Sequence, residues 1–342
     1  MTTSPPAAGP RLAACWPFTP LALTETARWS QLTRTGAYQR LWVGQSAGLD
    51  VASTVAHAAG AGHRFPLGIA VNVIPLHHPV QAAQQARSMV LASGHDLRLC
   101  FSPGDPAVQR AFGGSAYASP LTAAREFLAA VRALVDGDPT RLEGDYFPLA
   151  AGLPGPRLPA RVLLGLGTLR PRMARLAGEV ADVATTWLTP PSYVRDVIAP
   201  ALAEGASAAD RPRPELVVPV HAVLAQPGRD VAALAEQAVG THLRLPHYRA
   251  VLEAAGDHAA LRDGPAGAIA SGLVTCGGVD DIAARVLDAV EAGADEVPLV
   301  LHRPPGPWAA VRDEWLAVGE VVAACLDQLA PAPAPPPRGV AV

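Results

Sequence analysis

The chain has 342 residues, of which 50% are hydrophobic and 17% charged, and its formal net charge is −3. These totals allow one large core and provide no basic surface for nucleic acid or for an anionic membrane. No apolar run approaches the roughly 20 residues of a membrane span. Residues 1–10 lack the basic cluster and apolar core of a signal peptide, so a cytoplasmic protein without nucleic-acid or membrane partners is expected.

The cysteines and the cationic residues limit the kinds of functional site that the chain can form. The cysteines are too far apart for a zinc site or a redox pair, so reduced thiols and no metal are expected at Cys15, Cys100, Cys276 and Cys325. All 27 cationic residues are arginines, which excludes a Schiff-base lysine and a Walker lysine. Any phosphate site must therefore use arginine and backbone N–H groups.

Apolar runs that alternate with helical patterns predict a series of β/α units. The expected strands cover residues 12–18, 41–43, 66–74, 97–101, 161–164, 183–188, 215–224 and 296–301. The expected helices cover 24–38, 51–61, 80–91, 119–135, 171–178, 193–204, 279–291 and 308–329, with a small hairpin at 141–148 and an irregular helical insertion at 230–271. This alternation predicts a (β/α)8 TIM barrel with insertions, as one domain over residues 11–329. The tails, 1–10 and the Pro/Ala-rich 330–342, are expected to be disordered.

A TIM barrel places its functional residues at the C-terminal ends of the strands. The residues expected there, in strand order, are Trp16 to Phe18, Gln45 and Ser46, Asn72 and Val73 with His77 and His78, Ser102 with Gly104 and Asp105, Gly165 with Gly167 and Thr168, Thr185 to Trp187, His221, and His302 with Arg303. A metal site at His77 and His78 is not expected, because adjacent residues of an extended segment point in opposite directions. His78-Pro79 is instead expected to fix the start of a helix.

One stretch, Ala160 to Pro190, carries the strongest pattern. A short apolar strand is followed by a predicted turn at Gly165, Gly167 and Thr168. Pro171 then suits the first position of a helix, where free N–H groups favour a phosphate. The turn lacks the third glycine of a dinucleotide-binding fingerprint, so a Rossmann site is not expected.

The run from Pro171 to Asp182, Pro-Arg-Met-Ala-Arg-Leu-Ala-Gly-Glu-Val-Ala-Asp, resembles the luciferase-like monooxygenase superfamily, in particular the branch that uses the deazaflavin coenzyme F420. The resemblance extends more thinly from about Leu41 to Arg303. It implies that the barrel mouth holds the cofactor, with its phosphate at the glycine turn. The cofactor-binding candidates are Asn72, Val73, Ser102, Gly165, Gly167, Thr168, Arg170, Arg172, Thr186, Trp187 and Arg303.

The resemblance also implies a bulge with a non-proline cis peptide at the end of the third strand, at Val71-Asn72-Val73, which backs the cofactor ring. The alternative is a plain buried strand in which Asn72 bonds to a neighbouring loop. Family members usually carry an acidic residue or a histidine after the second strand, where this chain has Gly44-Gln45-Ser46. Gln45 can orient a group but cannot shuttle a proton. The catalytic candidates are Gln45, Ser46 and Asn72.

This departure favours reduction of an activated double bond, an alkene or an imine, over alcohol oxidation with the usual base. We expect hydride transfer from reduced F420 in specialised metabolism, on a small-molecule or peptide substrate such as a dehydroamino acid in a modified peptide. Two alternatives stay open: an FMN-dependent luciferase-like monooxygenase, and a non-catalytic barrel that binds a partner protein or peptide. The resemblance further implies a homodimer.

Overall fold

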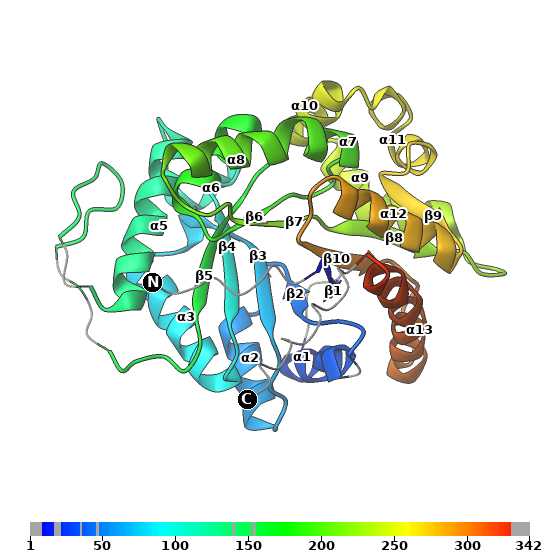
Figure 1. The fold of residues 1–342 in the computed structure, drawn as a ribbon, viewed down its shortest axis with the longest axis horizontal. Coiled ribbons are helices and arrows are strands. Elements are labelled where there is room, and N and C mark those ends of the chain that lie inside the picture. The colour runs from blue at the N-terminus through cyan, green and yellow to red at the C-terminus, as the bar shows by residue number, and fades with distance from the viewer. Residues whose placement is uncertain are drawn as a thin grey trace, which may run out of the picture.

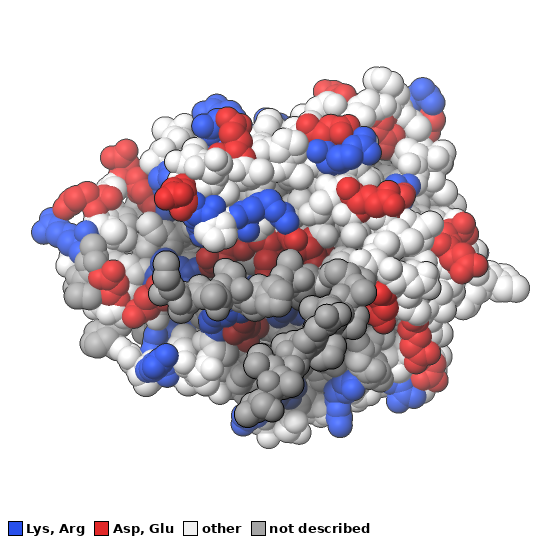
Figure 2. Space-filling model, viewed as in Figure 1, with Lys and Arg blue, Asp and Glu red and all other residues white. Residues whose placement is uncertain are grey.

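The computed structural model describes residues 9–16, 22–34, 36–45, 48–138, 141–150, 152 and 155–329. Apart from residues 9 and 10, both predicted disordered tails lie outside these ranges, and so does the catalytic candidate Ser46. No helix within these ranges is long and apolar enough to cross a membrane. Acidic and basic side chains are interspersed on the face that Figure 2 presents, where no continuous basic patch is seen.

Parallel strands form a closed barrel in which the first strand pairs with the last, as the sequence predicts (Figure 1). The barrel follows the order β1, β2, β3, β4, β5, β6, β7 and β10, and β8 and β9 extend the sheet from β10. The strands are β1 (Arg11–Cys15), β2 (Leu41–Val43), β3 (Leu67–Val73), β4 (Leu97–Ser102), β5 (Val162–Gly167), β6 (Val183–Thr185), β7 (Glu215–Val217), β8 (Val220–Leu224), β9 (Val274–Gly277) and β10 (Glu296–Leu301).

Helices surround these strands (Figure 1). They are α1 (Leu23–Trp29), α2 (Val51–Gly60), α3 (Pro79–Ser93), α4 (Pro106–Gly113), α5 (Pro120–Asp136), α6 (Pro171–Val180), α7 (Pro191–Tyr193), α8 (Ala199–Ala208), α9 (Val231–Leu243), α10 (Pro246–Ala255), α11 (His258–Ala270), α12 (Val279–Glu291) and α13 (Trp308–Asp327). Short helical turns are η1 (Ser30–Arg34), η2 (Ile74–Leu76) and η3 (Val194–Ile198). Helices α9, α10 and α11 form the insertion that the sequence predicts over residues 230–271.

The predicted seventh strand, 215–224, is interrupted. It divides into β7 and β8 at Val218 and Pro219, because proline has no N–H to continue the ladder. The sequence analysis also missed β9, which pairs with β8 after the insertion. The prediction for residues 24–38 was too long: α1 ends at Trp29, and Ala22 rather than Thr24 is its N-cap. The predicted hairpin at 141–148 is one antiparallel bridge between Leu142 and Leu149.

The predicted helix end at Gly178 was wrong, since α6 continues to Val180. Gly178 serves instead in the packing of α6 against α8. A Cβ on Gly178 would collide with the carbonyl oxygen of Leu202, and a Cβ on Gly205 would collide with the carbonyl oxygen of Arg175. Two facing glycines thus let the two helix backbones approach each other closely.

The inner face of the barrel is layered, because alternate residues of each strand point inward and paired residues of parallel strands share a face. An apolar layer lies in the middle and contains Ala13, Trp42, Cys100, Val183, Val217 and Val300. A Cβ on Gly68, which pairs with Trp42, would collide with the indole ring, so this glycine makes room for the ring.

A charged layer closes the N-terminal end of the barrel. Glu296, at the start of β10, is fully buried. Its carboxylate accepts hydrogen bonds from Trp42 Nε1 at 2.6 Å, from Arg40 Nε at 3.1 Å and from Arg11 Nε at 3.1 Å. Glu296 therefore ties β10 to β1 and to the segment around β2, where the first and last strands of the barrel meet.

A second carboxylate completes this layer. Glu215, at the start of β7, accepts two hydrogen bonds from Arg98 of β4, at 2.6 and 2.8 Å. Arg98 is 4% exposed, and the pair spans strands that are not neighbours in the sheet. Breaking such a buried pair by removing one partner is costly, because it leaves an uncompensated charge.

We predict that Glu296→Gln destabilises the fold strongly. The amide leaves Arg40 and Arg11 without their shared carboxylate in a buried layer, so the free energy of unfolding should fall by about 3–5 kcal/mol. Urea denaturation measures this change. Glu291→Gln, at the exposed end of α12, is the matched control and should change stability by less than about 0.5 kcal/mol. Similar losses in both variants would contradict the role given to Glu296.

Candidate functional site

Two histidines meet at the C-terminal end of the barrel. His221 of β8 pairs in register with Val300 of β10, so both point into the barrel, and His302 follows two residues later on the same face. His221 Nδ1 lies 3.0 Å from His302 Nε2, within hydrogen-bond distance, and the two rings are stacked. The ring of Trp187, just beyond β6, packs edge-on against His221 with the centroids 4.5 Å apart. Three strand ends thus converge on one buried imidazole pair.

Burial keeps this pair uncharged at neutral pH. It lowers the pKa of His302 to about 4, and the nearby His242 adds to the shift. Burial also lowers the pKa of His221 well below its usual value, and the charges of His302 and His242 act in the same direction. His221 Nε2 is buried and has no hydrogen-bond partner among the described residues. Two neutral rings that share one hydrogen bond can carry a proton on either outer nitrogen, depending on the tautomer.

The end of β3 carries the bulge that the resemblance implies. The register against β4 shifts between Ile69 and Asn72, and the peptide bond between Ala70 and Val71 is cis. Gln45 Oε1, after β2, accepts a hydrogen bond from Val73 N at 2.7 Å. Gln45 therefore holds the bulged strand in place through its amide oxygen.

The glycine turn after β5 begins later than the sequence suggests. Gly165 is a buried member of β5, where a Cβ would lie 2.5 Å from Cys100 Sγ, so its role is packing inside the barrel and the predicted turn at this residue was wrong. Gly167 ends the strand, and a Cβ there would lie 3.1 Å from Val71 Cγ1 on the β3 bulge. Gly167 thus lets β5 approach the bulge.

Thr168 does not fit the expected role of phosphate donor. It is fully buried, and its N–H and its hydroxyl both donate to the carbonyl oxygen of Thr185, at 2.7 and 3.2 Å. These bonds pin the turn to β6 and leave Thr168 no free donor. Thr186 follows Thr185 in the chain, and its hydroxyl is buried without a hydrogen-bond partner among the described residues.

The start of α6 is open to solvent and positive. Arg170 is its N-cap and Pro171 its first residue, and no side chain caps the helix. Arg170 and Arg172 are exposed, and neither has a carboxylate partner in the part of the chain that the structure describes. The charge of Arg170 affects two nearby side chains. Burial raises the pKa of Tyr193, and Arg170 partly reverses this shift. Burial lowers the pKa of His247, and Arg170 lowers it further. The N–H groups of Met173 and Ala174 already donate to the carbonyl oxygen of Arg170, so an anion at this helix start would meet the N–H of Arg172 and the two guanidinium groups.

Arg303, the residue after His302, belongs to a buried ion triad. Its Nε donates to Glu314 at 3.1 Å, and Glu314 also binds Arg229 at 2.7 and 3.0 Å. Arg303 Nη1 is buried without a hydrogen-bond partner among the described residues. Two arginines on one carboxylate leave one positive charge uncompensated at this end of β10.

The other candidates lie at the same end of the barrel. Asn72 is 9% exposed, and Val73 and Ser102 are half-buried. Ser102 Oγ accepts a hydrogen bond from Gly104 N at 3.3 Å and so shapes the loop after β4. Asp105 is the N-cap of α4 and accepts from Ala107 N and Val108 N, which makes it structural.

Four of the eight buried polar atoms that lack a hydrogen-bond partner in the described residues lie at this end of the barrel, although such atoms are rare in folded proteins. In the described residues they include His77 Nε2 after β3, Thr186 Oγ1 after β6, His221 Nε2 in β8 and Arg303 Nη1 after β10. Their position suits a polar ligand in the barrel mouth. No group of three or more metal-binding side chains exists in the described ranges. His78 caps α3 through Nδ1, at 3.3 Å from Val80 N, which confirms its expected structural role.

Sequence reasoning missed two parts of this site. It placed His221 and His302 at the ends of two successive strands but did not pair their side chains, because one sequence does not show the register of β8 against β10. It predicted the insertion but gave it no part in the site, although His242 of α9 lies near Trp187 and the pKa of His247 in α10 is influenced by Asp105 and Arg170. The cluster of imidazole and phenol groups within residues 242–248 was the available signal.

Comparisons with known proteins show the family and the fold. The sequence model of the family described as "Luciferase-like monooxygenase" matches residues 9–296. The 5,10-methylenetetrahydromethanopterin reductase of Methanolobus tindarius is 28% identical over 306 residues, which cover 82% of this chain and 90% of that protein.

Two solved structures share the fold. An F420-dependent secondary alcohol dehydrogenase in complex with an F420-acetone adduct has a TM-score of 0.73 at 16% identity and covers 93% of this chain and 99% of its own. The oxygenating constituent of 3,6-diketocamphane monooxygenase of Pseudomonas putida, in complex with FMN, has a TM-score of 0.66 at 13% identity. The match covers 92% of this chain and 98% of that structure's chain.

We predict that His302 makes stability depend on pH. An unfolded histidine titrates near pH 6.5, whereas His302 in the folded protein has a pKa of about 4. Between these values the unfolded chain binds more protons, so the free energy of unfolding should fall as the pH is lowered from about 6.5 to about 4. The free energy of unfolding, measured across this range, should depend less steeply on pH in His302→Gln than in wild type. The control His57→Gln, at an exposed site, should keep the wild-type dependence. An unchanged slope in His302→Gln would contradict the buried neutral state.

Proposed function

The chain belongs to the luciferase-like monooxygenase family, and we propose that it is an F420-dependent oxidoreductase that reduces an activated double bond. Family membership confirms the fold family and the enzyme class predicted from the sequence, a flavin- or deazaflavin-dependent oxidoreductase of the luciferase-like type. The observation that carries the finer proposal is the uncharged His221–His302 pair in the barrel mouth, together with a glutamine in place of an acid or base after β2.

The residues at the mouth fit a phosphate-bearing cofactor. The uncapped start of α6, with Arg170 and Arg172 free of carboxylate partners in the described ranges, suits the phosphate. The bulge at Asn72 and Val73, held by Gln45, and the indole of Trp187 offer walls for a ring system. When bound, reduced deazaflavin supplies a hydride.

The protein must then provide a proton to the atom next to the carbon that receives the hydride. Gln45 cannot do so, because its amide does not titrate and its oxygen already accepts from Val73 N. In one tautomer His302 Nε2 donates to His221 Nδ1, and His221 Nε2 carries a proton on the buried outer edge of the pair. As His221 Nε2 gives up this proton, the shared proton moves from His302 Nε2 to His221 Nδ1 and a proton from solvent enters at His302 Nδ1, so both rings stay neutral. His221 is therefore the proton donor of the proposal, and His302 is its relay to solvent.

The substrate class follows from this chemistry. A neutral acid without a strong base suits an alkene or imine that is already polarised, such as a dehydroamino acid in a modified peptide. Alcohol oxidation would require a base that takes a proton at neutral pH, whereas the pKa of both histidines lies too low for efficient proton removal. Use of FMN with oxygen remains the alternative, because the family description names monooxygenases.

We predict selective binding of F420 that depends on Arg170. Purified protein should bind F420 more tightly than FMN, and Arg170→Gln should weaken F420 binding about tenfold through loss of a charge contact of about 1.4 kcal/mol. Fluorescence titration measures both affinities. Arg64→Gln removes an exposed arginine elsewhere and should bind like wild type. Tighter binding of FMN, with oxygen consumption, would move the assignment to the monooxygenase, and binding of neither would favour a non-catalytic barrel.

We predict that His221→Gln slows turnover without loss of cofactor. With reduced F420 and 2-cyclohexenone as a probe alkene, kcat should fall by about 100-fold or more, the usual contribution of a general acid. The Kd for F420 should stay within about twofold of wild type. His57→Gln, on the exposed side of α2, is the control. Wild-type kcat in His221→Gln would show that water or another group supplies the proton.

A further inference from the structure

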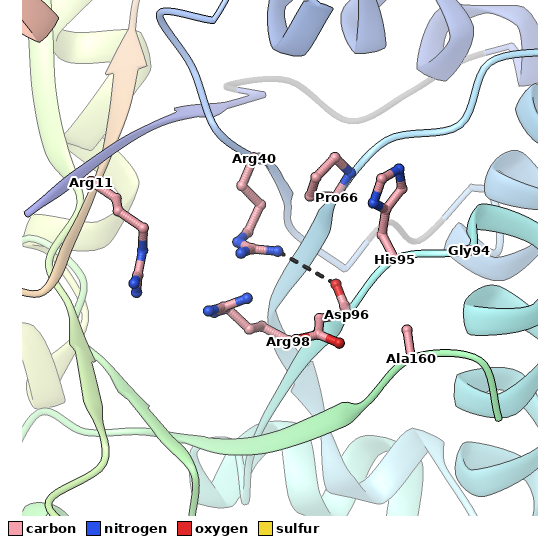
Figure 3. A pocket seen from close by; sticks show the side chains of 8 residues that line it. All are labelled: Arg11, Arg40, Pro66, Gly94, His95, Asp96, Arg98 and Ala160. Carbon is pink, nitrogen blue, oxygen red and sulfur yellow. Dashed lines mark hydrogen bonds between the residues drawn. The ribbon is translucent and has the colours of Figure 1, made fainter. Parts of the chain in front are cut away.

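A cavity of 460 Å³ opens at the N-terminal end of the barrel, opposite the site described above. It lies where strands β1 to β5 begin, against the charged layer (Figure 3). The residues that line it are Arg11, Arg40, Pro66, Gly94, His95, Asp96, Arg98 and Ala160. Its volume falls within the range of small-molecule sites, roughly 300–1,000 Å³.

The charges around this cavity do not cancel. Three arginines, Arg11, Arg40 and Arg98, share two carboxylates, Glu215 and Glu296. Asp96 favours the charged form of Arg98, but its carboxylate is the ion-pair partner of a fourth arginine, Arg161, which binds it through Nε and Nη2 at 3.0 and 2.6 Å. One positive charge is therefore left over in a layer where Arg40 and Arg98 are at most 6% exposed.

The guanidinium groups keep donors free on the cavity side. In Figure 3 the ends of Arg40 and Arg98 point toward each other, with Arg11 beyond them. Among the described residues, Arg40 uses only Nε and Nη1, and Arg98 uses only Nε and Nη2. Arg11 Nη2 is buried and makes no hydrogen bond, although it lies 3.3 Å from Glu215.

The positive charges of Arg11, Arg40 and Arg98 repel one another, and an anion bound between them would reduce this repulsion. Burial lowers the pKa of Arg40, Glu296 opposes that shift, and Arg98 and Arg11 add to it. Converging guanidinium groups match the tetrahedral oxygens of a phosphate, which can accept several N–H groups at once. The cavity also leaves room for an organic group beyond one phosphate.

We propose that this cavity binds the phosphate group of a small phosphate monoester, on the free donors of Arg40, Arg98 and Arg11. This site is separate from the proposed cofactor site, because it lies at the opposite ends of the strands. A bound phosphate supplies the negative charge that this layer lacks and binds only the folded protein, so binding also stabilises the fold.

Isothermal titration calorimetry with inorganic phosphate, in a phosphate-free buffer of low ionic strength, tests the site. Ala160→Glu places a carboxylate at the cavity wall without removing any arginine, and it should weaken phosphate binding at least about tenfold. Ala203→Glu makes the same change on the exposed side of α8 and should bind phosphate like wild type. Arg40→Lys keeps the charge, loses the planar fork and should bind several-fold more weakly.

Phosphate could also bind at the start of α6, and Arg170→Gln separates the two sites. The proposal expects the heat of binding to persist in Arg170→Gln and to disappear in Ala160→Glu. The opposite pattern would overturn it, as would the absence of saturable binding by wild type up to about 10 mM phosphate. Circular dichroism of each variant establishes that loss of binding does not reflect loss of folding.

Discussion

The buried carboxylate of Glu296 is the point on which the barrel depends. It accepts from Trp42, Arg40 and Arg11 where the first and last strands meet, so it fixes the closure of the sheet. The same inward face of β10 continues through Val300 to His302, six residues later. One strand therefore carries the charged layer at one end and the histidine pair at the other. A shift of β10 by one residue would turn both Glu296 and His302 away from the barrel interior.

Polar groups are buried at both ends of the barrel, and the free-energy cost of burying them is offset in a different way at each end. At the N-terminal end the charges remain and pair with one another, and Trp42 adds a neutral donor. At the C-terminal end burial keeps His221 and His302 uncharged, and His221 Nε2 has no hydrogen-bond partner among the described residues. An apolar layer separates the two ends. Glu215 and Glu296 therefore lie at the opposite end of the barrel from the histidine pair, whose neutral state results from burial.

Much of this fold follows from local patterns, and the site follows only in part. Apolar runs, prolines at helix starts and the alternation of elements predict the barrel, and the run from Pro171 to Asp182 predicts the family. The strand at Val274–Gly277 depends on which segments become neighbours, which no local pattern encodes. The division of the seventh strand had a local signal in Pro219, which the sequence analysis overlooked. The charged layer has the same origin: Arg11, Arg98 and Glu215 begin their strands, but only barrel closure brings them together. The pairing of His221 with His302 likewise needs the register of β8 and β10.

Gln45 explains how the mouth can work without an acid after β2. Its amide oxygen accepts from Val73 N, a backbone donor that the bulge releases from the regular ladder. A carboxylate at this position could accept the same bond, but it would bring a negative charge next to the wall proposed for the cofactor ring. It would also raise the pKa of nearby imidazoles by favouring their charged form. A neutral amide holds the bulge and leaves the histidine pair uncharged. Gln45 therefore fixes the geometry of β3 without adding a charge to the end of the barrel that holds the histidine pair.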